Sequence, residues 1–197
     1  MMKDSVAYYD RNAERFAADT GGVDMSALHE RFLRYVPAGG RILDAGCGVG
    51  RDARAFTERG FAVVGFDASA EMVRLARERV GTLAEIRHMR FEDVAWRGEF
   101  DGIWACASLL HLPPAAFPGV ASQLVGALRP GGAWYMSFKL GVGERRDAGR
   151  LFVDHTEASL RAALSGLQVR PVEPWTTADV RPGRTDVQWL NAITLKL

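Results

Sequence analysis

The chain has 197 residues, which is enough for one domain of ordinary size with a single hydrophobic core. Hydrophobic residues make up 48% and charged residues 25%, which excludes disordered and fibrous proteins, and two cysteines are too few for a disulfide scaffold. The net charge of +1 lacks the strongly basic character of a dedicated nucleic-acid-binding domain. No apolar run approaches the ~20 residues that span a bilayer, and the first residues contain no signal-peptide core, so a reduced, cytoplasmic protein is expected.

Two helices are predicted before the main domain. Apolar residues recur at helical spacing over 6–17, and Thr20 followed by two glycines ends that pattern. A second helix is predicted over 28–36, started by Asp24 or Ser26 and ended by Pro37. We therefore expect residues 1–38 to form a helical lid or cap, and residues 39–197 to form the main domain.

From residue 39 onward, short apolar runs alternate with helical patterns. Strands are predicted at 41–46, 61–67, 84–89, 100–105, 133–138, 168–173 and 189–197, and helices at 51–59, 70–80, 117–128 and 157–165. Residues 139–152 show no clear period and are predicted to form a loop. The alternation favours an α/β fold: a doubly wound, Rossmann-like sheet, mostly parallel with an antiparallel C-terminal strand, and helices on both faces.

The first predicted strand runs into a glycine-rich loop, D-A-G-C-G-V-G, over 44–50. Glycine lets the backbone turn sharply and approach a ligand closely at the C-terminal edge of a parallel sheet. A dinucleotide site would need its third glycine at position 51, which is Arg51, and no G-K-[ST] follows to make a P-loop. A tight turn without a ligand is the alternative, which three glycines in five residues disfavour.

Asp67 ends the second predicted strand, 23 residues beyond Asp44. An acid at this place can accept hydrogen bonds from both hydroxyls of a ribose. The alternative is that Asp67 only caps the next helix, but Ser69 is the better capping residue.

Together these features resemble the class I S-adenosylmethionine-dependent methyltransferases, most strongly over residues 42–138. The glycine loop matches the first motif of that family, and the sequences F-E-D at 91–93, F-D-G-I-W-A-C-A-S-L-L-H at 100–111 and L-R-P-G-G at 128–132 match its later motifs. The G-R-D step at 50–52 is similar to tellurite-resistance and related small bacterial methyltransferases. The resemblance implies that S-adenosylmethionine donates a methyl group to a small-molecule acceptor by in-line displacement, leaving S-adenosylhomocysteine.

The resemblance also implies which residues bind the cofactor. Asp44 would face its methionine end, Asp67 would accept the ribose hydroxyls and Asp93 would accept from the adenine amino group. The hydroxyl of Tyr9, on the apolar face of the first helix, is expected to reach the methionine carboxylate. The remaining expected contacts are Gly46, Cys47, Gly48, Gly50, Arg51, Ala68, Met72, Phe91, Glu92, Cys106, Ala107 and Ser108.

His111 is the candidate general base, because an imidazole pKa suits proton removal near neutral pH. A histidine that merely caps or packs is the alternative. The other residues expected at the acceptor are Tyr8, Asn12, Lys139, Arg146 and Trp175, and the cations after the fifth core strand would suit an anionic acceptor group. His29, His88 and His155 are expected at the surface, and no metal site is predicted.

The sequence disfavours two other functions. Methylation of a protein or nucleic acid is disfavoured by the near-neutral charge and by the lack of an N-P-P-[YF] motif. A cofactor-binding protein without catalysis is disfavoured by the polar residues on the acceptor side. No membrane or nucleic-acid partner is expected, while the acceptor atom and the oligomeric state stay open.

Overall fold

The structure is a computed structural model that describes residues 2–181, 183–184 and 186–197. Its helices are α1 (Met2–Thr20), α2 (Ser26–Leu33), α3 (Arg51–Glu58), α4 (Ala70–Val80), α5 (Phe117–Ala127) and α6 (Glu157–Ala163), with 3-10 helices η1 (Phe91–Asp93) and η2 (Leu109–His111). Its strands are β1 (Arg41–Ala45), β2 (Ala62–Asp67), β3 (Glu85–His88), β4 (Phe100–Ala105), β5 (Leu128–Lys139), β6 (Gly143–Asp147), β7 (Arg150–Asp154), β8 (Val169–Ala178) and β9 (Gln188–Lys196). None of these described helices combines the length and apolar composition that crossing a membrane requires.

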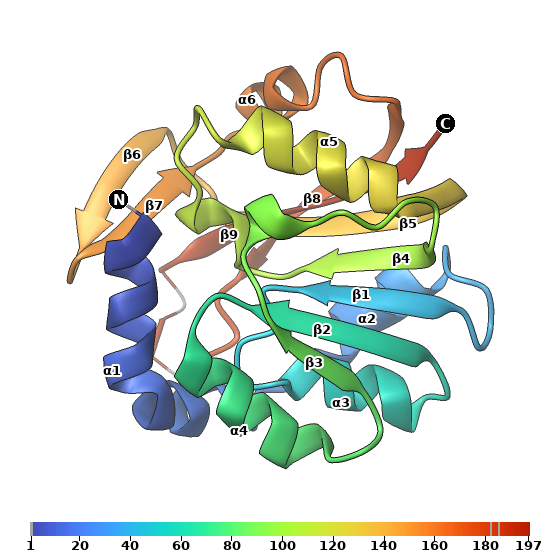
Figure 1. The fold of residues 1–197 in the computed structure, drawn as a ribbon. Coiled ribbons are helices and arrows are strands. Elements are labelled where there is room, and N and C mark those ends of the chain that lie inside the picture. Colours follow the sequence, from blue (N-terminus) through green and yellow to red (C-terminus); the bar gives the residue numbers. More distant parts are fainter. Residues whose placement is uncertain (1, 182, 185) are drawn as a thin grey trace.

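Seven strands form one sheet in the order β3-β2-β1-β4-β5-β9-β8 (Figure 1). The first five strands in this order run parallel, and β9 runs antiparallel between β5 and β8. This confirms the expected doubly wound sheet with an antiparallel C-terminal strand. The chain order reverses direction between β1 and β4, and ligands of open α/β sheets bind at such a switch point, beyond the carboxyl ends of the strands.

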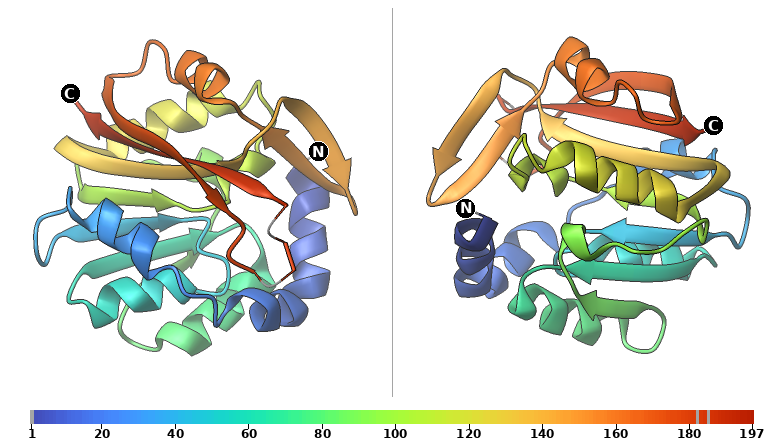
Figure 2. Two further views of the ribbon diagram at one scale, coloured as in Figure 1. Left: turned by 180° about the vertical axis from the view of Figure 1, so that it is seen from behind. Right: turned by 45° about the horizontal axis from the view of Figure 1, so that its top comes forward.

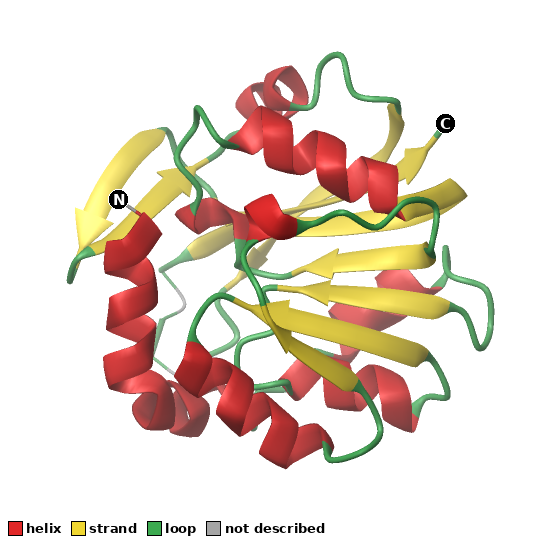
Figure 3. Ribbon diagram, viewed as in Figure 1, coloured by secondary structure: helices red, strands yellow, loops and turns green. Residues whose placement is uncertain are grey.

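Helices cover both faces of the sheet (Figure 3). Successive residues of a strand point to opposite faces. Ile42 and Trp104 therefore pack in the cluster under α2, α3 and α4, whereas Leu43 and Ile103 pack in the cluster under α5 and α6. Because both faces are buried, the central strands are almost continuously apolar, which is why sequence patterns could locate them.

One region differs from its prediction. Residues 139–152, expected to form a loop, contain most of a hairpin in which β6 pairs antiparallel with β7 (Figure 2). Ala148 and Gly149 both have positive φ, 49° and 84°, as a two-residue hairpin turn requires. The sequence prediction was wrong because β6 is mostly exposed and charged, so it lacks the apolar alternation that marks a half-buried strand.

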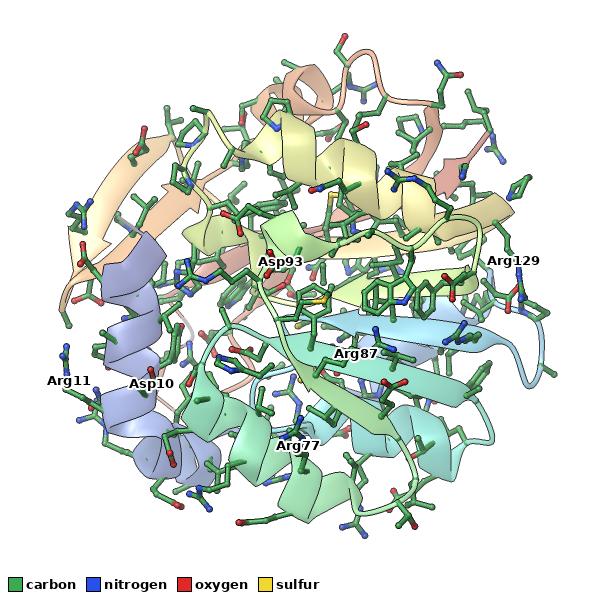
Figure 4. All side chains as sticks on the ribbon, in the orientation of Figure 1. Asp10, Arg11, Arg77, Arg87, Asp93 and Arg129 are labelled. Atoms are coloured by element: carbon green, nitrogen blue, oxygen red, sulfur yellow. The ribbon has the colours of Figure 1, made fainter. Side chains whose placement is uncertain are left out.

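Helix α1 lies across the carboxyl ends of the strands, between the β6–β7 hairpin and α4 (Figures 1 and 2). At the hairpin, the Leu151 backbone N–H donates to Ser5 Oγ at 3.2 Å. At α4, Ser69 Oγ–H donates to Asp10 Oδ1 at 2.6 Å, and Figure 4 shows Asp10 on the side of α1 that faces α4, with Arg11 pointing away. The helix thus forms a roof over the switch point.

Candidate active site

A cavity of about 270 Å³ lies beneath α1. Its wall is built from segments far apart in the sequence: the glycine loop after β1, the end of β2, the segment after β4, the end of β5, strand β7 and the β8–β9 connection. The cavity therefore occupies the switch point that the strand order defines.

The glycine loop presents its backbone to the cavity. Gly46 has φ 77°, and a Cβ atom on it would lie 2.5 Å from Ser108 Cβ, so no other residue fits there. The N–H groups of Gly46 and Cys47 donate to the carbonyl oxygen of Phe66 at 2.9 and 2.8 Å, which ties the loop to β2. Gly48, with φ 52°, also lines the cavity. This bare backbone is a cradle into which a nucleoside cofactor can approach closely.

Asp67 borders the same cavity at the end of β2. Its Oδ2 accepts the Gly48 N–H at 2.9 Å and its Oδ1 accepts the Ser69 N–H at 2.9 Å. Burial raises the pKa of Asp67, and these backbone hydrogen bonds oppose that rise. Ser69 caps α4 as expected, since its Oγ accepts the Met72 N–H at 3.2 Å. Asp67 is therefore not the N-cap of α4, and it lines the cavity beside the glycine loop.

Asp44 lies behind the glycine loop rather than in the cavity wall. It is 2% exposed, and its Oδ2 has no hydrogen-bond partner within the described part of the chain. Burial and the neighbouring charge of Asp52 raise its pKa well above the usual range. Gly50 also lies outside the lining, because it packs against Ala76 of α4.

The F-E-D motif at 91–93 contributes fewer residues to the cavity than the family resemblance implies. Phe91 lines the cavity, whereas Glu92 and Asp93 are exposed and lie outside it. Asp93 Oδ2 accepts the backbone N–H of Arg90 at 3.1 Å in the loop after β3 (Figure 4). Ala68 and Met72, two further expected cofactor contacts after β2, also line the cavity.

The segment after β4 is held in an uncommon conformation. Ala107 has φ 51°, a left-handed value that costs a residue with Cβ roughly 1 kcal/mol, and its N–H donates to Ser137 Oγ at 2.8 Å. Ser108 Oγ–H donates to the Ala45 carbonyl oxygen at 2.7 Å. Burial raises the pKa of Cys106 to about 12 and that of Cys47 well above its usual range, so both thiols stay protonated.

Tyr9 and His111 are hydrogen-bonded across the cavity. His111 Nδ1 lies 2.6 Å from the Leu151 carbonyl oxygen, which can only accept, so Nδ1 carries the proton. His111 Nε2 therefore accepts the Tyr9 hydroxyl at 2.8 Å. Burial lowers the pKa of His111 to about 4 and raises that of Tyr9 to about 12. The near-neutral pKa expected for His111 is thus wrong, and the Tyr9 hydroxyl, expected at the methionine carboxylate, is bonded to His111 instead.

The other residues expected at the acceptor are dispersed. Only Lys139 joins His111 in the cavity wall. The Tyr8 ring stacks under the Arg150 guanidinium at 4.2 Å, and Asn12 Nδ2 donates to the Tyr8 carbonyl oxygen. Arg146 is exposed on β6, 3.6 Å from Asp4, and Trp175 lies on β8 under Arg31.

A buried hydrogen-bond network around Asp52, beside the glycine loop, was not predicted from the sequence. Asp52 Oδ1 accepts from His29 Nε2 at 3.0 Å and Arg51 Nε at 2.8 Å, and Oδ2 accepts from Arg51 Nη2 at 2.8 Å and Trp104 Nε1 at 2.9 Å. His29, expected at the surface, is 3% exposed, so that prediction was wrong. The sequence signal for burial of His29 was its position three residues before Phe32, which places both side chains on the buried face of α2. The network leaves Arg51 Nη1 at the cavity, 3.4 Å from the Thr20 carbonyl oxygen.

Comparison with known proteins places the chain in a family. Residues 42–132 match the sequence model of the methyltransferase-domain family. The chain is 30% identical to the ubiquinone biosynthesis O-methyltransferase of Xanthomonas axonopodis pv. citri, over 88% of this chain and 85% of that protein.

Two solved structures share the fold. The 1,6-didemethyltoxoflavin-N1-methyltransferase of Burkholderia thailandensis, bound to 1,6-didemethyltoxoflavin and S-adenosylhomocysteine, superposes with a TM-score of 0.80 at 23% identity, covering 99% of this chain and 86% of that one. A TehB-like S-adenosylmethionine-dependent methyltransferase of Corynebacterium glutamicum superposes with a TM-score of 0.74 at 19% identity, covering 98% of both chains.

Fold and site together define a Rossmann-like enzyme that holds a nucleoside cofactor at its switch point. The chain belongs to the class I S-adenosylmethionine-dependent methyltransferases. The glycine cradle, Asp67 and the Nη1 end of Arg51, whose partner within the protein is the Thr20 carbonyl oxygen, fit this cofactor, which has a ribose and a methionine carboxylate. No group of three or more metal-binding side chains occurs among the described residues.

Proposed function

We propose that this enzyme methylates a small-molecule acceptor that enters the cavity beside Tyr9 and His111. The observation that carries the proposal is the continuity of the cavity: the glycine cradle and Asp67 line one part of its wall, and Tyr9, His111 and Lys139 line another. Cofactor and acceptor can therefore lie side by side in one enclosed space, as a direct transfer requires.

At the cofactor end, Asp67 accepts the ribose hydroxyls and the Arg51 end left uncovered by Asp52 binds the methionine carboxylate. Ala68, Met72 and Phe91 flank the adenine, and Cys106, Ala107 and Ser108 border the reacting end. When bound, S-adenosylmethionine supplies a sulfonium methyl group that a nucleophile takes by in-line displacement.

At the acceptor end, His111 takes up the proton of an acceptor hydroxyl or amine at Nε2, through or in place of the Tyr9 hydroxyl. Neutral His111 has the lone pair for this step because its proton is fixed on Nδ1 by Leu151. A weak base suffices, since the acidity of a hydroxyl rises steeply as its oxygen gains the methyl group.

A macromolecular acceptor is disfavoured by the roof. α1 and the β6–β7 hairpin contact each other over the cavity, so a polymer would have to displace them. The relatives described above are named for ubiquinone biosynthesis and for a toxoflavin precursor, both of which concern small molecules.

The experiment that tests this function is a transfer assay with methyl-labelled S-adenosylmethionine. We expect label in one class of a panel of small phenols, amines and carboxylic acids, and about tenfold slower transfer by Tyr9→Phe, which removes a hydrogen bond at the acceptor. Tyr35→Phe, in the turn after α2 and outside the cavity lining, is the matched control. Label entering only protein or nucleic acid would contradict the proposal.

We also infer that α1 is the lid within the cap region 1–38. The same samples test this by hydrogen exchange, which is expected to slow over residues 2–20 when S-adenosylhomocysteine is added. Equal exchange with and without the product would instead make α1 a fixed part of the core.

Asp67→Ala is expected to weaken binding of S-adenosylhomocysteine by roughly 10- to 150-fold, because a hydrogen bond to a charged group contributes about 1.5–3 kcal/mol. Calorimetry measures the change, and NAD is not expected to bind to either protein. Glu71→Ala, which removes an exposed acid of α4, is the control. An unchanged dissociation constant for Asp67→Ala would leave Asp67 only the role of fixing the Gly48 and Ser69 backbone.

A further inference from the structure

Three cationic side chains converge on one aromatic ring beside His111. Lys139 Nζ lies 4.6 Å from the centre of the Phe152 ring, Arg145 Cζ lies 4.4 Å from it and Arg150 Cζ lies 5.0 Å from it. The His111 ring meets the same ring edge-on, with 4.9 Å between ring centres. We call Lys139, Arg145 and Arg150 around Phe152 the cation cluster.

The carboxylates near the cluster neutralise it only in part. Arg145 Nε bonds to Asp154 Oδ2 at 3.0 Å, and Arg150 Nη2 bonds to Asp147 Oδ2 at 3.0 Å. Lys139 has no carboxylate within ion-pair distance among the described residues. Lys139 and Arg150 line the cavity, so the uncompensated charge faces the space where the acceptor lies.

The electrostatics of neighbouring groups agree with this arrangement. Burial and the charges of Arg145, Arg181 and Arg150 lower the pKa of Lys139, and the charge of Asp154 opposes them. Burial is the main reason for the low pKa of His111, and Arg150, Lys139 and Arg145 lower it further. An anion bound here would relieve the repulsion between these cations.

The cofactor does not account for the cluster. In the proposed function its anionic end is bound by Arg51, which begins α3 directly after the glycine loop that follows β1. Lys139 ends β5, and β4 lies between β1 and β5 in the sheet. Because neighbouring strands are about 4.8 Å apart, β1 and β5 lie roughly 10 Å apart across the sheet, so Arg51 and Lys139 extend toward the cavity from different places.

We propose that the acceptor is an anion whose carboxylate or phosphate group is bound by Lys139 together with Arg150. This inference rests on the proposed function, because it concerns the acceptor of the same cavity. The anionic group and the atom to be methylated belong to one small molecule, which the cluster orients so that its nucleophile lies next to His111. Lys139 is then a specificity-determining residue: it favours an acid over the corresponding neutral amide.

The test measures anion binding to the protein saturated with S-adenosylhomocysteine. The probes are benzoate, inorganic phosphate and benzamide, which is a neutral analogue of benzoate. We expect benzoate or phosphate to bind at least about tenfold more tightly than benzamide, and increasing salt to weaken only the anions. The stronger of the two anions shows whether the group is a carboxylate or a phosphate.

Lys139→Met is expected to weaken anion binding by about tenfold while leaving affinity for S-adenosylhomocysteine unchanged. Methionine keeps a flexible apolar side chain of similar length and removes only the charged end. Lys139→Arg keeps the charge and is expected to retain anion binding, so it controls for misfolding. Arg161→Met removes an equal charge from the exposed face of α6 and is expected to change nothing.

Three results of the anion-binding measurements would overturn the inference: equal binding of benzamide and the anions, unchanged anion binding in Lys139→Met, or no binding of any probe. An equal loss of S-adenosylhomocysteine affinity in Lys139→Met would also do so, because it would assign Lys139 to the cofactor. Failure of the proposed function is a separate result, since it appears as absent methyl transfer to small molecules and not in these binding measurements.

Discussion

His111→Gln is expected to lower kcat by about 10²- to 10⁴-fold, which is the contribution of a positioned general base. The glutamine amide keeps a neutral hydrogen-bonding group in place of the imidazole, but it cannot take up a proton where Nε2 lies. Because His111 lies at the acceptor end, affinity for S-adenosylhomocysteine is expected to stay unchanged. Steady-state rates with the acceptor found in the labelling panel, together with calorimetry, measure both quantities.

The pH dependence of the wild-type rate follows from the His111 pKa of about 4. That pKa is lower than the usual value, so the imidazole stays neutral and able to accept a proton down to about pH 4. The rate is therefore expected to show no loss from His111 between pH 8 and pH 5. A rate that falls below pH 6.5 only when His111 is present would contradict this assignment. An unchanged kcat in His111→Gln would mean that the acceptor needs no base and that His111 only packs.

Asp52→Ala is expected to lower the free energy of unfolding by about 3–5 kcal/mol, the loss typical of breaking a buried ion pair. The substitution leaves Arg51, His29 and Trp104 without their shared acceptor. Burial opposes ionisation of Asp52, but the charge of Arg51 and the hydrogen bond from His29 outweigh it and lower the pKa of Asp52. Urea unfolding monitored by tryptophan fluorescence measures the effect.

Glu58→Ala is the matched control for Asp52→Ala. It removes a carboxylate from the same helix, but Glu58 and its partner Arg54 are about half exposed, and such pairs contribute only about 0–1 kcal/mol. If Asp52→Ala lowered the free energy of unfolding no more than Glu58→Ala does, the buried network would be redundant for folding. Its role would then be confined to holding Arg51 at the cavity.

Features that depend on neighbours in sequence could be predicted. The glycine loop, Asp67 and the cap at Ser69 follow from strand-end patterns, and the parallel sheet follows from the alternation of apolar strands and helices. The β6–β7 hairpin could not be predicted, because its first strand is stabilised without an apolar pattern. The bond of Tyr9 to His111 joins positions 102 residues apart, and no local spacing encodes it. The same holds for the meeting of Lys139 with Phe152.

Tyr9 and Asp10 are neighbours in α1, yet they fasten this helix to opposite sides of the crevice. Tyr9 bonds to His111, which follows β4, and Asp10 bonds to Ser69, which follows β2, so the two bonds flank the glycine loop at the end of β1. The cavity lies beneath α1, so departure of the spent cofactor past this helix requires both bonds to break. We therefore expect this helix to release both sides of the crevice when the spent cofactor departs, which makes its opening a step of the cycle distinct from the methyl transfer itself.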